Sequence, residues 1–225
     1  MKAGLEALLV ISLCLPALAE DKPKPLPKDF ESLKALAVQN NPRVQFDLGE
    51  RYLKGQEVEK NYKKAFMWWR KAAKQDFPKA QHNLGVMYAD GNGVKRDYRE
   101  AVKWYHKAAM QNIPQAQNNL GLMYSKGQGV PEDDREAVKW YRKAAEQGHS
   151  RAQTNLGIKY FRGEGVLEDY VTAYMWCNIA AAKGNELAME TKIHITKNMT
   201  PGQISMAQEL CKETLKKLEA NKKKE

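Results

Sequence analysis

Apolar residues along this chain recur at the spacing of a helix face, and the whole pattern returns every 36 residues. In one unit Leu84 and Tyr88 lie four residues apart with Gly85 beside them. This stretch predicts an amphipathic helix whose glycine admits a close neighbour. A second apolar stripe, which includes Ala101 and Trp104, predicts a second helix whose tryptophan packs against alanines. We therefore expect two antiparallel helices in each unit.

The same residue types return at the same positions in four successive units, with no insertion between them. The recurring positions are Leu48, Leu84, Leu120 and Leu156; Gly49, Gly85, Gly121 and Gly157; Tyr52, Tyr88, Tyr124 and Tyr160; Ala65, Ala101, Ala137 and Ala173; and Trp68, Trp104, Trp140 and Trp176. The units span residues 44–79, 80–115, 116–151 and 152–187. Units of this kind stack on one another and share a continuous core.

Turn and capping residues mark the connection between the two helices of a unit. Gly91 and Gly93 are suited to a turn with positive φ. Asp97 is predicted to cap the second helix, with Glu100 completing a capping box. In the first unit Glu57 replaces the second glycine, so we expect a less constrained loop there.

The segments outside the four units differ in character. Residues 28–43 predict an N-terminal capping helix, after a Pro- and Lys-rich spacer at residues 20–27. Residues 188–218 predict a C-terminal capping segment whose helix starts at Thr200, with Pro201 in its first turn and Gln203 reaching back, and could extend to about Leu218. Residues 219–225 form a basic tail.

Two consecutive motifs carry a family resemblance. They read A-Q-x-N-L-G-x-M-Y-x-x-G-x-G-V and A-V-K-W-Y-x-K-A-A, and together they resemble the Sel1-like repeat, a relative of the tetratricopeptide repeat. The resemblance covers residues 44–187. It implies an all-α fold, an α-solenoid of antiparallel helix pairs in a right-handed superhelix, and a non-enzymatic scaffold that binds a protein or peptide. The "MTP-x-Q-I" ending is similar to that of exported bacterial members of this family.

The N-terminus predicts export. Lys2 precedes a short apolar run at residues 8–18, and small residues at Ala17 and Ala19 suit a cleavage site. We interpret residues 1–19 as a cleavable signal peptide, which predicts a periplasmic or secreted protein. Cys14 raises the alternative of a lipoprotein, but Leu13 stands where that signal normally has a small residue.

The formal net charge of +10 favours anionic partners. For an exported chain these are envelope phosphates and acidic proteins rather than nucleic acid. An envelope-associated factor that holds anionic polymer or lipid is therefore an alternative to the scaffold, while the plainest interpretation of the C-terminal lysines is a solvated tail. We expect a monomer.

No catalytic constellation emerges from the sequence. The four histidines share neither a repeat position nor a metal-ligand spacing, and HExxH and CxxC are absent, so we expect no metal and no cofactor. Trp69 is interpreted as a second aromatic beside Trp68. Some cysteine-rich relatives of this family have been linked to β-lactam binding or hydrolysis, but the chain has no Ser-x-x-Lys motif.

Cys177 and Cys211 follow the predicted signal peptide and leave two alternatives open. In an oxidising compartment they could form a disulfide that holds the terminal helix on the last unit. They are equally compatible with two buried free thiols.

Positions that differ between the copies are free to serve a partner. The third, seventh and eleventh residues of each unit lie on one face of the first helix, and in related arrays that face lines the concave groove. They are Phe46, His82, Asn118 and Thr154; Glu50, Val86, Leu122 and Ile158; and Lys54, Asp90, Lys126 and Arg162. This face is predicted to bind an extended or helical peptide of acidic character. The alternative is that these residues face solvent or pack between units.

Overall fold

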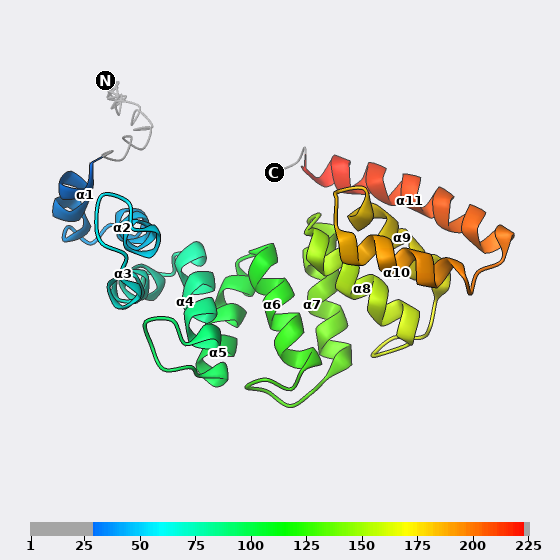
Figure 1. Ribbon diagram of the computed structural model, residues 1–225, viewed down its shortest axis with the longest axis horizontal. Coiled ribbons are helices and arrows are strands. Elements are labelled where there is room, and N and C mark those ends of the chain that lie inside the picture. Colours follow the sequence, from blue (N-terminus) through cyan, green and yellow to red (C-terminus); the bar gives the residue numbers. More distant parts are fainter. Residues whose placement is uncertain (1–28, 223–225) are drawn as a thin grey trace, which may run out of the picture.

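The computed structural model describes residues 29–222, with side chains described to residue 220, and within this range the ordered elements are helices. Figure 1 shows them following one another along a curved array. The helices are α1 (Phe30–Ala37), α2 (Pro42–Lys54), α3 (Tyr62–Lys74), α4 (Pro78–Asp90), α5 (Tyr98–Met110), α6 (Pro114–Ser125), α7 (Asp134–Glu146), α8 (Ser150–Arg162), α9 (Tyr170–Ala181), α10 (Glu186–Thr196) and α11 (Pro201–Lys222).

Each unit is an antiparallel pair, and the pairs stack in chain order: α2 with α3, α4 with α5, α6 with α7 and α8 with α9. The first helices α4 and α6 also touch directly, and α8 touches α10, which follows the last pair. These contacts place the first helices on the inner side of the curve. Figure 1 shows α3 and α5 on the outer side, beyond α2 and α4. The predicted all-α solenoid of helix pairs is confirmed.

The repeated glycine admits a close neighbour, as predicted. A Cβ built on Gly85 would overlap the Tyr105 ring, and one on Gly121 would lie 2.8 Å from the Tyr141 ring. These contacts come from the residue after the repeated tryptophan, at the position held by Trp69 in the first unit. Because a side chain at the glycine would meet the ring, the glycine sets how closely the two helices of a pair approach.

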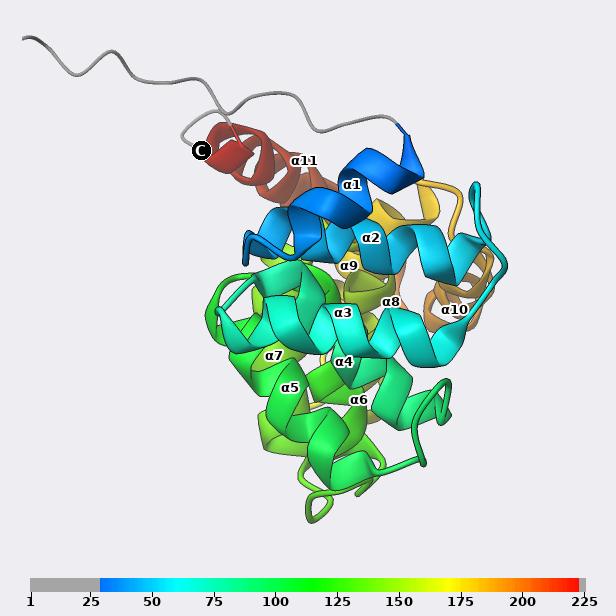
Figure 2. The ribbon, with the colours of Figure 1, turned by 90° about the vertical axis from the view of Figure 1, so that its left-hand side faces the viewer.

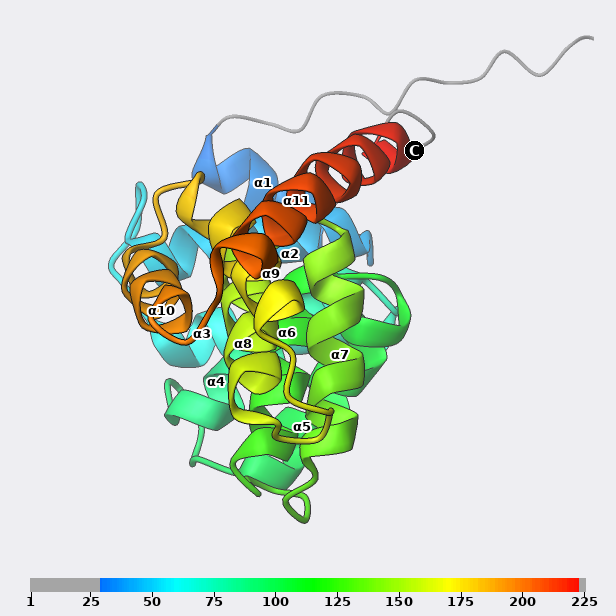
Figure 3. The same cartoon turned by 90° about the vertical axis from the view of Figure 1, so that its right-hand side faces the viewer.

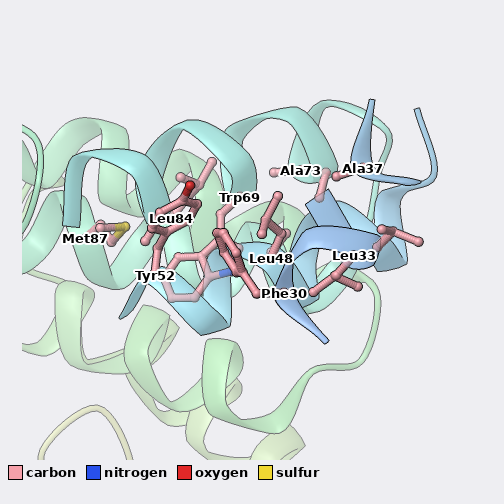
Figure 4. Close-up of a cluster of buried hydrophobic side chains, with 13 residues drawn as sticks. Phe30, Leu33, Ala37, Leu48, Tyr52, Trp69, Ala73, Leu84 and Met87 are labelled. Carbon is pink, nitrogen blue, oxygen red and sulfur yellow. The ribbon is translucent and has the colours of Figure 1, made fainter. Parts of the chain in front are cut away.

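Trp69 corrects the interpretation of the first unit. Its ring is only 2% exposed and packs against Gly49. Its indole N–H donates to the carbonyl oxygen of Phe46 at 3.1 Å. The neighbouring Trp68 is the less buried of the two. Trp69 is therefore the ring at the pair interface rather than a secondary aromatic, and Figure 4 shows it beside Leu48 and Tyr52.

The repeated tryptophan packs backward onto the second helix of the preceding unit. Trp140 on α7 belongs to one cluster with Ala101 and Ala108 of α5, and Trp176 on α9 belongs to one cluster with Ala137 of α7. The predicted packing of tryptophan against alanines is confirmed. Dispersion contacts of this kind join successive units along the outer side.

The turns follow the predicted chemistry except in one detail. Gly91 and Gly93 have φ values of 79° and 72°, and the Asp97 carboxylate accepts from the backbone N–H of Arg99 and Glu100 at 2.9 and 3.1 Å. The reciprocal half of the capping box was wrong. The Asp97 N–H donates instead to the Tyr88 carbonyl, and Glu100 pairs with a lysine one turn later.

The first loop is held more firmly than its sequence predicted. Glu57 takes the glycine conformation, with φ of 58°. Its carboxylate accepts from the Phe30 N–H at 2.8 Å and pairs with the Arg51 guanidinium at 2.8 Å. These bonds compensate the strain of a positive φ in a residue with a Cβ, so the replacement of glycine ties this loop to α1.

The two ends of the array are covered differently. At the N-terminal end, α1 packs on α2 through Phe30, Leu33 and Ala37, and Figure 2 shows α1, α2 and α3 stacked in order. At the C-terminal end, α11 packs along α9 (Figure 3). The predicted capping box is present: the Thr200 N–H donates to Gln203 at 2.8 Å and the Gln203 N–H donates to Thr200 at 3.3 Å.

The two cysteines are free and buried, which is the second of the two interpretations left open by the sequence. The Cys177 thiol lies against Gly157, in the place of the ring found in the other units. The Cys211 thiol lies 3.6 Å from the Met175 carbonyl oxygen. Burial raises the pKa of Cys177 to about 12 and also raises that of Cys211.

Candidate docking site on the inner face

The inner face is hollowed where α4, α6 and α8 lie side by side. A cavity of about 470 Å³ opens between them. Its walls come from three first helices, with contributions from α5 and the loop after α6. The lining residues are His82, Val86, Ala89, Asp90, Tyr98, Tyr105, Gln115, Asn118, Asn119, Leu122, Met123, Gln128, His149 and Arg151. The volume is in the range of sites that hold a small ligand or a few peptide side chains.

The cavity has two chemically different ends because α4, α6 and α8 run in the same direction. Arg151, His149 and Gln115 lie at the N-terminal ends of these helices, whereas Asp90 and Gln128 lie at the opposite ends. Helix N-termini carry partial positive charge, and Arg151 adds a full one. One end therefore favours an anionic group, while Val86 and Leu122 supply an apolar middle.

A row of buried glutamines joins each first helix to the second helices on either side of it, and sequence reasoning missed its role. The Gln81 amide donates to the Ala73 carbonyl at 3.3 Å and accepts from the Gln111 amide at 2.8 Å. The equivalent bonds recur in the other units, joining Gln45 to Ala37 and Gln75, Gln117 to Ala109 and Gln147, and Gln153 to Ala145 and Lys183. Identity in all four copies was the available signal. Each buried amide is satisfied.

His82 is locked in one neutral form by its neighbours. Its Nε2 accepts from the Asn119 amide at 3.3 Å. Because an amide nitrogen can only donate, Nδ1 carries the proton, which it donates to Asn83 at 3.2 Å. Burial lowers the pKa of His82. Asn118 occupies the same position one unit later and accepts from Asn155 at 3.0 Å.

His149 is also used as an acceptor. It stands at the N-cap of α8, where its Nδ1 accepts from the Ala152 N–H at 3.2 Å. Burial lowers the pKa of His149, and the nearby positive charges of Arg151 and Lys183 lower it further. Both histidines of the cavity are therefore held neutral by bonds that protonation would break.

The twelve residues that the sequence singled out do not share one site. The residues that line the cavity are His82, Val86, Asp90, Asn118 and Leu122. Those that line a smaller hollow near α1 are Phe46, Glu50 and Lys54. Thr154 is 1% exposed and donates to the Ser150 carbonyl, so it has no surface to offer a partner. Ile158 is half-buried, and Lys126 and Arg162 are exposed outside the cavity.

Third positions largely pack between units, which was the alternative interpretation of this face. Asn118 is 6% exposed, and its amide is already bonded to Asn119 and Asn155. Position seven, occupied by Val86 and Leu122, is the part of the predicted face that reaches the cavity as apolar surface. Gln115, His149 and Arg151 were missed because they lie at the junction between units, where copies differ in chemistry.

Among residues 29–222, no three His, Cys, Asp or Glu side chains gather in a manner suited to a metal ion. Within the same range no helix has the length and apolarity required to cross a membrane.

Stacked helix pairs around a hollowed inner face define an α-solenoid repeat protein. The Sel1 repeat model matches residues 42–77, 78–113, 114–149 and 150–185, and the chain belongs to this family. The matches begin two residues before the units drawn from the sequence, so that each holds one complete helix pair. Proteins of this family generally mediate protein–protein interaction and are typically non-catalytic scaffolds.

Two solved structures share substantial identity with the chain. One is a protective antigen present in uropathogenic Escherichia coli strains, with 45% identity and a TM-score of 0.70 over 72% of this chain and 35% of that chain. The other is a Sel1 repeat protein from Oxalobacter formigenes, with 41% identity and a TM-score of 0.66 over 72% of this chain and 68% of that chain. The chain thus spans about a third of the length of the first. A search of curated proteins found no match.

Proposed function

We propose that this chain is an exported scaffold that binds one partner protein by a peptide segment held on the inner face. The observation that carries the proposal is the cavity between α4, α6 and α8, which presents apolar side chains, a cationic end and bonded polar groups. The predicted signal peptide supports a periplasmic or external location, although it lies outside the described residues.

The layout of charge indicates the kind of peptide. An apolar side chain would lie against Val86 and Leu122, and an acidic side chain or a carboxylate would lie at the Arg151 end. Arg151 is exposed and forms no ion pair with another described residue, so its guanidinium is available to a carboxylate. Asp90 at the other end disfavours an acidic residue there and sets the direction of the peptide.

A photo-crosslinking side chain introduced at Leu122 tests the proposal. We expect it to capture one protein, whereas the same group at Leu215 on α11 should not. The affinity of the captured protein is then measured for Val86→Asp combined with Leu122→Asp. We expect a loss of about 30-fold or more, which corresponds to about 2 kcal/mol at an interface hot spot.

The matched control combines Met206→Asp with Leu215→Asp, which places the same charges on exposed apolar positions of α11. It should bind as the parent protein does. Equal affinities of the cavity variant and the control would show that the partner docks elsewhere. Arg151→Glu should weaken binding if the peptide is acidic at that end, and unchanged affinity would remove the acidic requirement.

A further inference from the structure

The positive charge of the protein is concentrated on the outer helices of the array. Helix α3 carries five basic and no acidic residues. Helix α5 carries three basic residues and one acidic residue, and α7 carries four basic and three acidic residues. These three helices therefore have an excess of eight basic residues in a chain whose formal net charge is +10. Helix α9 has no charged residue. The excess thus falls steadily from the N-terminal to the C-terminal end.

Three lysines of this face recur at one repeat position. Lys71, Lys107 and Lys143 each follow the repeated tryptophan by one helical turn, and all three are exposed. Their Nζ atoms lie 4.3, 4.9 and 4.4 Å from the centroids of Trp68, Trp104 and Trp140. The ring holds each ammonium in place but leaves its other hydrogen-bond donors free.

These lysines are not neutralised within the described part of the chain. The neighbouring Lys103 and Lys139 pair with glutamates one turn before them, whereas Lys71, Lys107 and Lys143 form no such pair. The result is a row of fixed ammonium groups, one on each outer helix. The three lysines thus stand at one repeated position on three successive outer helices.

We propose that the outer face of α3, α5 and α7 binds a linear polyanion, whose anionic groups lie on Lys71, Lys107 and Lys143. A chain with regularly spaced charges matches sites repeated on successive helices, because each further site is reached without a second loss of translational freedom. A flexible polymer can also follow a curved surface (Figure 1). The larger positive excess of α3 makes that end the stronger part of the site.

A lipid bilayer fits this face less well. Interfacial helices bury a broad apolar stripe in the headgroup region. On α3, α5 and α7 the large apolar side chains that are exposed are Met67 and Met110, and the lysines lie over the tryptophan rings. The curve of the array also limits the area that a flat surface can reach.

The test is the affinity of the full-length protein for labelled long-chain inorganic polyphosphate across a salt series. In the triple variant Lys71→Gln, Lys107→Gln and Lys143→Gln we expect the affinity at low salt to fall at least about tenfold. The slope of log affinity against log salt should fall by about 2, since each phosphate that a lysine neutralises on a single-stranded polyanion contributes about 0.7 to that slope. The triple lysine-to-arginine variant should retain binding.

The matched control is Lys197→Gln, Lys216→Gln and Lys217→Gln, which removes the same charge from exposed positions at the C-terminal end. It should keep most of the affinity. Equal losses in both triple variants would overturn the proposal in favour of net charge alone. If tripolyphosphate binds as tightly as the long polymer, the proposal that one polymer contacts several lysines of the row would be overturned.

Vesicles of phosphatidylcholine with one-third phosphatidylglycerol form the second arm. Tighter binding to these vesicles than to polyphosphate, with the same dependence on the three lysines, would replace the polymer with a membrane. Leu122→Ala on the inner face should leave polyphosphate binding unchanged. This result separates the failure of one proposal from the failure of the other.

Discussion

The last helix pair of the array and the two helices that follow it show what is needed to form a pair. Helix α8 packs against α9 with Gly157 at their contact. One repeat later, Ile193 stands at the position of Gly157, and Lys192 stands at that of Leu156. Helix α11 then packs along α9. The difference indicates that the small residue admits the second helix of a pair, and that a large one ends the array.

The same comparison holds for the polar positions. Gln153 on α8 is buried and bonded to Ala145 and Lys183, whereas Met189 occupies its place on α10 and is exposed. The N-cap of α8 is His149, and that of α10 is Asn185. Helix α10 thus lies in the repeat frame but lacks the residues that would continue it.

The largest effect is expected from placing the α10 residue into α8. In Gly157→Ile the new side chain would occupy the space of the Cys177 thiol, which lies 2.5 Å from the position of a Cβ there. We expect a loss of about 4 kcal/mol or more in the free energy of unfolding, measured by denaturant titration. The reverse change, Ile193→Gly on the exposed face of α10, should cost about 1 kcal/mol through helix propensity alone.

Equal losses in these two variants would contradict the role given to the glycine. If Gly157→Ile does not fold, Gly157→Ala retains the test, because its Cβ still meets the thiol. Combining it with Cys177→Ala removes the sulfur and should restore most of the stability. A double variant as unstable as Gly157→Ala would assign the loss to the helix backbone rather than to the contact.

A smaller effect is expected from the glutamine row. Gln117→Met removes the bond to the Ala109 carbonyl and the bond from the Gln147 amide. We expect a loss of about 2 kcal/mol in the free energy of unfolding, because the remaining polar groups lie buried with fewer partners. Gln115→Met, two residues away and exposed, should change stability by less than about 0.5 kcal/mol. A cost that is the same in both variants would mean that the row is not a stabilising element.

Most of the fold could be predicted because it depends on residues that every copy repeats. The position of Gly85, the cap at Asp97 and the tryptophan packing all followed from periodicity. The aromatic residue that meets the glycine could not be found this way. Trp68 and Trp69 are adjacent, and the position of Trp69 varies among Trp, Tyr and Cys in the four copies, so identity favoured the wrong neighbour.

The candidate site was only partly predictable, because variation between copies has two causes. At Val86 and Leu122 it gives different surface in the cavity. At His82 and Asn118 it gives different partners for the asparagine of the next unit. The sequence alone cannot distinguish a position that lines the cavity from one that bonds to the next unit, because it does not show which polar groups are in contact. The residues at helix junctions, including Arg151, became visible only when three first helices were placed side by side.

The smallest effect is expected from a change of pH. It distinguishes the buried histidines of the cavity from the exposed histidine of α10. Burial lowers the pKa values of His82 and His149 below the ordinary value of 6.5, so the unfolded chain binds protons that the folded chain refuses. The contribution of the two neutral histidines to the free energy of unfolding is therefore fully present above pH 6.5 and is lost as the pH drops below it. Protonated His149 can no longer accept from Ala152, and its charge would lie at the positive end of α8.

The repeats themselves supply the test variants. His82→Asn introduces the residue found one unit later at Asn118, and His149→Asn introduces the residue found one unit later at Asn185. Both retain an acceptor that does not titrate, because the equivalent asparagines accept from Asn155 and from the Ala188 N–H. We expect the double variant to be as stable as the parent near pH 7.5 and to lose less stability at pH 5.5.

The control is His194→Asn, on the exposed surface of α10, which should have the stability of the parent at both pH values. If the double variant loses as much stability at pH 5.5 as the parent does, the acid sensitivity arises elsewhere, and protonation of the two cavity histidines is not its cause.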